Sequence, residues 1–167
     1  LAIALAVLLG IALGTLAALR QNTAVDYAVM ATAMTGITIP NFVMAPLLTL
    51  MFGVWLSWLP VAGWNGGAPR NLVLPVIALA LPQIAYIARL TRGSMIEVLH
   101  ANFVRTARAK GLRERIVVAR HALKGTLLPV VSYLGPATAQ VVTGSVVIET
   151  IFGIPGIMLQ AIRKNYR

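Results

Sequence analysis

The chain has 167 residues but no cysteine, only four acidic residues and only two histidines. Without cysteine there is no disulfide framework, thiolate metal site or cysteine nucleophile. The acids are too scattered to suggest an acid–base pair, and the histidines show no metal-ligand spacing. We therefore expect no catalytic site and no metal site on this chain. The acids are Asp26, Glu97, Glu114 and Glu149, and the histidines are His100 and His121.

Charge of either sign is also scarce. Only 11% of the residues are charged and 59% are hydrophobic, whereas soluble domains are about a quarter charged. A chain with so little polar surface is expected in lipid. The net charge of +10 would suggest nucleic acid on a soluble domain, but here the charge lies between apolar stretches. Nucleic acid is therefore not an expected partner.

Long uncharged stretches divide the chain into candidate membrane spans. A helix needs about 20 apolar residues to cross the hydrocarbon core, which predicts an all-α, polytopic membrane helix bundle. The first apolar run begins at residue 1 without the features of a signal peptide, and we interpret the chain as part of a longer membrane protein. The predicted spans are residues 1–19, 27–54, 71–90 and 125–148.

The second uncharged stretch, residues 27–69, is too long for one straight span. Pro40 and Pro46 are expected to kink it. Trp55, Trp58 and Trp64 indicate where it leaves the membrane, because tryptophan favours the headgroup level. The glycines and prolines that follow predict an exposed turn.

The basic residues predict the orientation. Nine of the fourteen lie between residues 89 and 124, and short basic loops remain in the cytoplasm. The segment 93–124 is therefore predicted to be cytoplasmic. Arg163, Lys164 and Arg167 would then lie on the opposite side of the membrane from the cytoplasm, contrary to the same rule.

Small residues predict close helix packing at two places, because small side chains at a spacing of four let helix backbones approach. One set is in the first span and the other follows it. The sets are Ala2, Ala6, Gly10, Gly14 and Ala18, and Ala24, Ala28, Thr32 and Gly36.

The cytoplasmic segment has the period of an amphipathic helix, with apolar residues every three to five positions. Gly111 interrupts it, which predicts two short helices joined by a turn there. From these residues alone, a basic amphipathic helix lying on anionic lipid is one interpretation.

The run from Ile96 to Leu112 resembles the EAA loop of binding-protein-dependent ABC importers, and most closely its peptide-transporter branch. Arg105 and Thr106 replace the Glu and first Ala of the general motif, and Leu128-Pro129 comes later than usual, as in the peptide branch. Overall the chain resembles the B-type permease subunit of the oligopeptide and dipeptide family. Further matching segments are Trp64–Gly67, Thr91–Met95, Arg120–Lys124 and Gly144–Gly156.

The resemblance implies a multi-pass subunit of the bacterial cytoplasmic (inner) membrane whose coupling helix docks into an ATP-binding subunit. The implied partners are a second permease subunit, two ATP-binding subunits, an extracytoplasmic substrate-binding protein, a peptide substrate and membrane lipid. ATP and Mg²⁺ would sit on the partner ATPases, since this chain has no phosphate-binding loop motif. No cofactor is expected on this chain, and it is not expected to be an enzyme.

Two groups of residues are candidates for these roles. Phe103 and Leu112 could contact an apolar groove on the ATPase. In the last span, polar residues could line the translocation path or contact the binding protein, although polar residues also join helices to one another. The coupling residues are Phe103, Arg105, Thr106, Ala107, Arg108, Lys110, Gly111 and Leu112. The path residues are Gln140, Thr143, Ser145 and Glu149.

Two further hypotheses remain. One is a homologous permease for dipeptides, nickel or glutathione, which would differ only in cargo. The other is a membrane scaffold whose basic loop binds anionic lipid.

Overall fold

The computed structural model describes residues 1–63 and 68–154, and every regular element in these residues is a helix. The predicted all-α helix bundle is confirmed. The elements are α1 (Ala2–Leu19), α2 (Ala24–Thr38), α3 (Asn41–Leu48), the π-helix η1 (Thr49–Trp55), α4 (Pro69–Leu99), α5 (Asn102–Ala109), α6 (Glu114–Ile116), the π-helix η3 (Val117–Ala122) and α7 (Leu123–Phe152).

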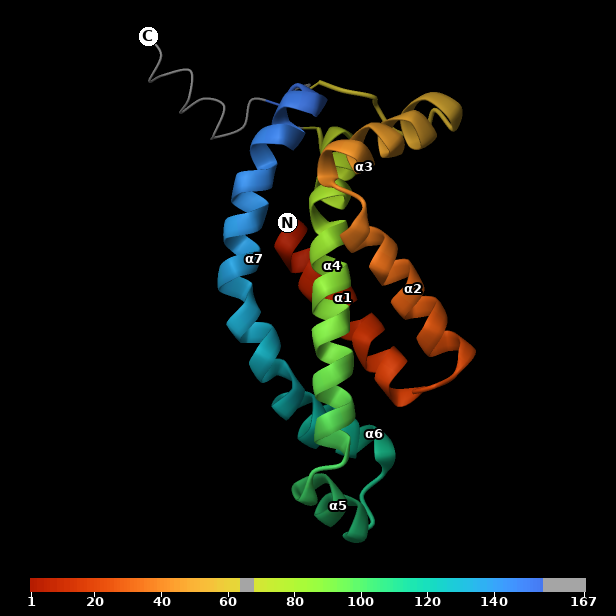
Figure 1. The fold of residues 1–167 in the computed structure, drawn as a ribbon, viewed down its shortest axis with the longest axis vertical. Helices are drawn as coiled ribbons and strands as arrows, with labels where there is room; N and C mark the ends of the chain where they lie inside the picture. The colour runs from red at the N-terminus through yellow and green to blue at the C-terminus, as the bar shows by residue number, and fades with distance from the viewer. Residues whose placement is uncertain (64–67, 155–167) are drawn as a thin grey trace.

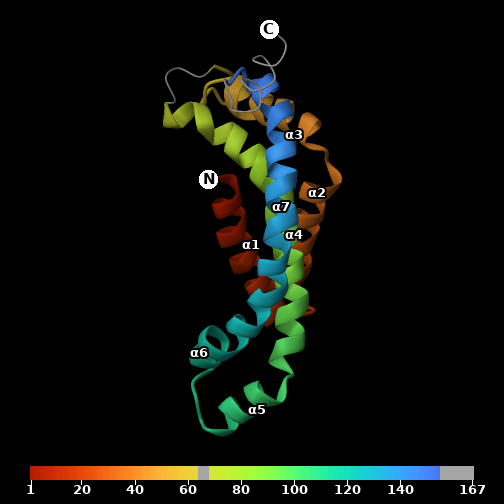
Figure 2. The ribbon, with the colours of Figure 1, turned by 90° about the vertical axis from the view of Figure 1, so that its left-hand side faces the viewer.

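Helix α4 is the centre of the bundle, and α1, α2 and α7 each pack against it (Figures 1 and 2). Helices α4 and α7 are the longest elements, and α5 lies beyond the other helices at one extreme of the molecule. We call this extreme the basic end. The opposite extreme, where α3 and η1 lie, is the tryptophan end, because Trp55 and Trp58 are 74% and 62% exposed there.

The first set of small residues forms a close helix contact, as predicted, and the partner is α4. All five residues of that set are buried. A Cβ added to Gly10 would lie 2.7 Å from the Cβ of Ile87 on α4, so the two helices touch through the glycine itself. Close backbone approach is what small residues permit in a membrane, where there is no hydrophobic force between helices.

The prediction for the second set is wrong for three of its four members. Ala24, Ala28 and Thr32 are exposed, and only Gly36 is buried. Helix α2 instead turns the face that carries Asp26 and Gly36 toward α4. The spacing of small residues did not identify this face because one of its two buried residues, Asp26, is charged and is not small.

The predicted kink in the second stretch is a sharp bend. Helices α2 and α3–η1 meet at an angle of 108°, and the break falls at Ile39, whose backbone is extended. A residue before proline is pushed out of the helical region, so Pro40 accounts for the bend. Pro46 lies inside α3 without ending it. The predicted range 27–54 is therefore a bent pair of helices and not one straight helix.

The other helices reach further toward the basic end than the expected spans did. Helix α4 continues to Leu99, and helical structure runs without a break from Glu114 to Phe152. Only a short part of the predicted loop 93–124 is therefore non-helical. The expected sequence features at 64–67, and Arg163, Lys164 and Arg167, lie outside the described residues.

Candidate functional site

Helix α5 forms the tip of the basic end and rests on the ends of α4 and η3 (Figure 2). Val104 is fully buried and Ala107 is 5% exposed. They join one apolar cluster with Met95 of α4 and with Val117 and Ala122 of η3. Apolar contacts therefore join α5 to α4 and to η3, which continues into α7.

Most of the predicted coupling residues lie on the outer surface of this tip. Phe103 and Leu112 remain 50% and 37% exposed, so two apolar side chains are available to a partner. Ala107 differs from the others because it faces the bundle. The exposed members are Phe103, Arg105, Thr106, Arg108, Lys110, Gly111 and Leu112.

Gly111 ends α5 in a left-handed conformation, with φ +74°. Its N–H donates to the carbonyl of Arg108 at 2.9 Å, and the N–H of Leu112 donates to the carbonyl of Ala107 at 3.4 Å. This pair of bonds is the Schellman motif, in which glycine is favoured because it has no Cβ. A Cβ at Gly111 would meet no atom within 4 Å among the described residues. Backbone conformation, and not crowding within the chain, therefore favours glycine here.

Arg108 holds the turn around Gly111 closed. Its guanidinium donates to both carboxylate oxygens of Glu114, at 2.7 and 3.1 Å, and to the carbonyl of Leu99 at 3.2 Å. The hydrogen bonds from Arg108 to the carboxylate hold the pKa of Glu114 below its ordinary value. The two side chains are 41% and 57% exposed, so the pair contributes about 1 kcal/mol or less.

Replacing Glu114 with glutamine is expected to speed amide hydrogen exchange in residues 110–113 by up to about fivefold at neutral pH. Because the folded pKa of Glu114 is lowered, the stabilisation is present above the ordinary carboxylate pKa and is lost as pH falls through the folded pKa. After correction for intrinsic exchange rates, the two proteins should therefore converge in acid. Glu97→Gln, which removes an exposed acid without an ion pair among the described residues, is the control. Equal exchange in the Glu114 variant and wild type at pH 7 would show that the pair does not close the turn.

A basic hollow of about 710 Å³ lies beside α5. Phe103 contributes its ring, and Arg120, His121, Lys124 and Gly125 complete the lining. The hollow connects α5 to the start of α7. It adds positive charge to the surface around the exposed Phe103.

The predicted path residues all lie on α7, toward the tryptophan end. Gln140 and Thr143 are exposed, whereas Ser145 and Glu149 are half-buried. The hydroxyl of Thr143 donates to the carbonyl of Ala139 at 2.7 Å, and that of Ser145 donates to the carbonyl of Val142. Both hydroxyl groups therefore donate their hydrogen bonds within α7.

Gln140 differs because it belongs to a polar network between α7 and α4. The Gln83 side chain, 5% exposed, donates to the Oε1 of Gln140 at 3.1 Å. The Tyr133 hydroxyl donates to the Oε1 of Gln83 at 3.0 Å. Tyr133 also stacks on Tyr86 of α4, with ring centroids 5.6 Å apart. Sequence reasoning identified Gln140 but missed its three neighbours, since their proximity depends on how α4 packs on α7.

Glu149 lies near the tryptophan end of α7. Its Oε2 is buried without a hydrogen-bond partner among the described residues, and so is the Oδ1 of Asn41 at the start of α3. Helices α3 and α7 pack together in this region. Two acceptors without donors mark this contact as incomplete within the described part of the chain.

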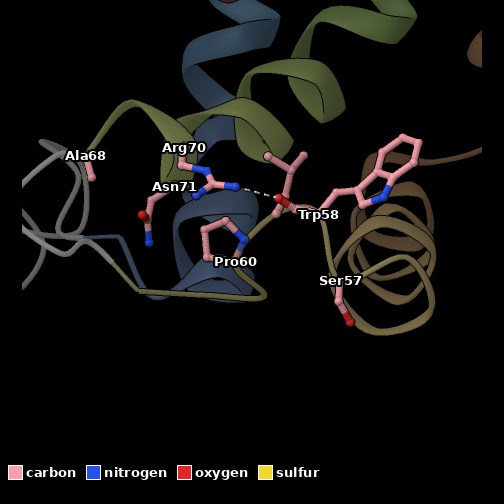
Figure 3. Close-up of a pocket in the computed structure, with 7 residues that line it drawn as sticks. Ser57, Trp58, Pro60, Ala68, Arg70 and Asn71 are labelled. Carbon is pink, nitrogen blue, oxygen red and sulfur yellow. Dashed lines mark hydrogen bonds between the residues drawn. The ribbon is translucent and has the colours of Figure 1, made fainter.

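A pocket of about 410 Å³ opens at the tryptophan end (Figure 3). Arg70 crosses it and donates to the carbonyl of Trp58 at 3.2 Å. Asn71 donates to the carbonyl of Gly63 at 2.8 Å. These bonds connect the start of α4 to the segment after η1, and they place Trp58 and Arg70 at the rim.

The structure also contains an ion pair that sequence reasoning missed. Asp26 is 1% exposed and accepts from the Nε and Nη2 of Arg92 at 2.5 and 2.6 Å. The backbone N–H of Asn22 donates to the same carboxylate at 2.9 Å. The α1–α2 turn is thereby fixed to α4 where α4 extends toward α5.

The structure is therefore a helix bundle with the basic helix α5 at one end. The buried face of α5 is apolar and its exposed face is basic. A family model described as "Binding-protein-dependent transport system inner membrane component" matches residues 10–166. The chain belongs to this family, which confirms the family predicted from the sequence and places the chain in the inner membrane.

Curated relatives are similar over most of the chain. The oligopeptide transport system permease protein OppB of Escherichia coli strain K12 is 63% identical over 153 residues, which are 92% of this chain and 50% of that protein. The protein of the same description from Haemophilus influenzae is 54% identical over 95% of this chain and 52% of its own length. The dipeptide transport system permease protein DppB of Bacillus subtilis is 50% identical over 93% of this chain and 50% of its own length. The chain thus spans about half the length of these relatives.

Proposed function

We propose that this chain is part of the permease subunit of an ATP-driven importer of oligopeptides. The printed descriptions of its relatives support peptide cargo, and the 63% identity to an oligopeptide permease exceeds the 50% to a dipeptide permease. The chain itself would not hydrolyse ATP. ATP and Mg²⁺ would bind to partner subunits.

The observation that carries this proposal is the position of α5. Its buried face contacts α4 and η3, while its outer face exposes basic residues and Phe103. A short helix with one face packed on its own protein and the other face exposed can fit into a groove in a protein partner. Because η3 continues directly into α7, displacement of α5 would reach the membrane helices through covalent structure.

We assign a different proposed partner to each end of the bundle. The basic end would face the cytoplasm and contact one of two ATP-binding subunits, with basic residues orienting the contact. The tryptophan end would face the extracytoplasmic substrate-binding protein. A second permease subunit would complete the translocation path between the two membrane domains. Gln140, Thr143, Ser145 and Glu149 remain our candidates for lining that path or contacting the binding protein.

Replacing Gly111 with valine is expected to uncouple peptide uptake from ATP hydrolysis, or to release the ATPase, while the spans stay inserted. A β-branched residue is strained at positive φ, where even an ordinary residue costs about 1–2 kcal/mol, so the Schellman turn would open. Co-purification of the ATP-binding subunits in mild detergent and uptake by intact cells measure the two effects.

Gly111→Asn is the matched control, because asparagine tolerates the left-handed conformation. It should retain ATPase association and most uptake. Normal association and normal uptake in the valine variant would contradict the coupling role of this turn.

Purification of the full-length protein also tests the class. Recovery of a second permease and ATP-binding subunits supports an importer. A scaffold with a lipid-binding loop would instead be recovered without them and would bind anionic liposomes through the basic end.

The cargo is tested by competition for uptake. Oligopeptides should compete with a labelled tetrapeptide, whereas nickel and glutathione should not. Stronger competition by dipeptides than by oligopeptides would favour the dipeptide alternative, which the Bacillus subtilis relative supports.

A further inference from the structure

Helix α7 has two exposed faces of different chemistry. Leu128, Val131 and Val142 lie on one face and are 76%, 62% and 47% exposed. This apolar face suits lipid chains. On the second face lies a row of exposed polar residues, which we call the polar stripe: Ser132, Gln140, Thr143 and Thr150. One apolar residue, the 44% exposed Val147, lies beside Gln140 on the same face, seven residues further along the helix.

Gln140 is the strongest hydrogen-bonding group on the polar stripe. The hydroxyls of Ser132, Thr143 and Thr150 donate to carbonyls of their own helix. Gln140 uses only its Oε1 within the described residues, as the acceptor from Gln83. Its side-chain amide group therefore keeps two N–H donors without a partner there.

These donors are near the middle of α7, so they are at membrane depth. A polar group that faces hydrocarbon without a hydrogen-bond partner is strongly disfavoured. Polar groups at this depth therefore face a water-filled path or another protein. The buried Gln83, itself held by the hydroxyl of Tyr133, fixes the Gln140 carboxamide in one orientation, which would serve a recognition site better than a lipid surface.

An acceptor lies on the same stripe. Pro136 has no N–H, so the carbonyl of Ser132, four residues earlier, loses its ordinary helical donor. Eight residues at about 1.5 Å each separate Ser132 from Gln140 by about 12 Å along the axis. An extended peptide covers this distance with roughly three to four residues at about 3.3 Å each.

We propose that the polar stripe recognises the backbone of an extended peptide in the translocation path, with Gln140 donating to a peptide carbonyl and Ser132 accepting from a peptide N–H. This inference rests on the proposed function as a peptide permease. Backbone groups are common to all peptides, so such a site accepts substrates of any side-chain sequence. The stacked rings of Tyr86 and Tyr133 lie beside the site and would offer substrate side chains an apolar contact.

The test compares uptake of a tetrapeptide with uptake of its backbone-ester analogue by the full importer with its binding protein. The ester lacks one N–H and has a weaker carbonyl acceptor. At saturating binding protein, wild type should transport the amide about three- to tenfold faster, the effect of one hydrogen bond. Gln140→Met, which keeps the side-chain length but removes the donors, should slow the amide and bring the ratio near one.

Thr138→Val is the matched control on α7 outside the polar stripe, because the exposed Thr138 also donates its hydroxyl within α7, to the carbonyl of Leu134 at 2.7 Å, and it should keep the wild-type ratio. Gln140→Glu is the second variant: it retains an acceptor for Gln83 but lacks the free amide, so it should also lose the discrimination. Affinity of both peptides for the isolated binding protein is measured separately, so that its preference is not mistaken for that of the stripe.

The outcomes separate the two proposals. Unchanged uptake and an unchanged ratio in both Gln140 variants would overturn the backbone-recognition site and leave the peptide permease intact. Loss of the second permease from the purified Gln140 variants would also overturn it, since Gln140 would then join the subunits. Absence of peptide uptake by the wild type would overturn the proposed function itself.

Discussion

Replacing Gly14 with leucine is expected to abolish the packing of α1 on α4. A Cβ at position 14 would overlap the carbonyl oxygen of Ala88 and lie 2.6 Å from the Cβ of Thr91. The oxygen belongs to the α4 backbone, so no side-chain rotation relieves the overlap. Even alanine should cost about 1–3 kcal/mol, the usual cost of overpacking. Leucine adds three more carbons and would force the helices apart.

Thermal aggregation of the full-length permease in detergent measures this loss, as does cross-linking between cysteines placed on α1 and α4. Gly135→Leu in α7 is the matched control, because a Cβ there meets nothing within 4 Å among the described residues. A Gly14→Leu protein that aggregates at the wild-type temperature and gives wild-type cross-links would contradict the proposed contact.

The sequence predicted the packing face of α1, though not its partner α4, because a spacing of four on one helix directly reports one face. The same reasoning failed on α2, where the buried face includes Asp26. Its burial depends on Arg92, which is 66 residues away in the chain. A spacing rule within one helix contains no information about such a partner.

The turn at the tip of the basic end could also be predicted, because it too depends on residues close together in the sequence. A glycine between two amphipathic stretches predicts a turn from local chemistry alone, and Gly111 has the positive φ that this chemistry requires. The buried face of α5 was less predictable. The apolar period ran through Phe103, but α4 ends at Leu99 and α5 begins at Asn102, so Val104 takes the buried position.

The polar network around Gln140 could not be predicted from the sequence, for a different reason. Gln83 and Tyr133 are ordinary residues in two separate apolar stretches, and nothing local indicates that they meet. Their contact depends on the register of α4 against α7, which only tertiary packing determines. Polar residues within spans nevertheless remain useful signals, because burial without a partner is costly.

Replacing Asp26 with asparagine is expected to detach the α1–α2 turn from α4. Breaking a buried ion pair costs about 3–5 kcal/mol, and we expect about 2–4 here because the Arg92 side chain is 26% exposed and keeps some hydration. The carboxylate also accepts the N–H of Asn22, whose φ is +60°. Asparagine keeps one oxygen but no charge, so the bond from Asn22 that offsets the strain of this left-handed turn would be weakened.

A double-mutant cycle of Asp26→Asn and Arg92→Gln separates this pair from general disturbance of the bundle. Thermal stability of the purified permease gives the free energies, and proteolysis within residues 20–23 reports opening of the turn. If the pair acts as one unit, the double variant should be little worse than either single one, because the main loss occurs once. Additive losses would show that the two residues stabilise the protein separately. Because Arg92 lies on the part of α4 that leads to α5, opening of the turn should also weaken ATPase coupling, although neither residue is at the tip.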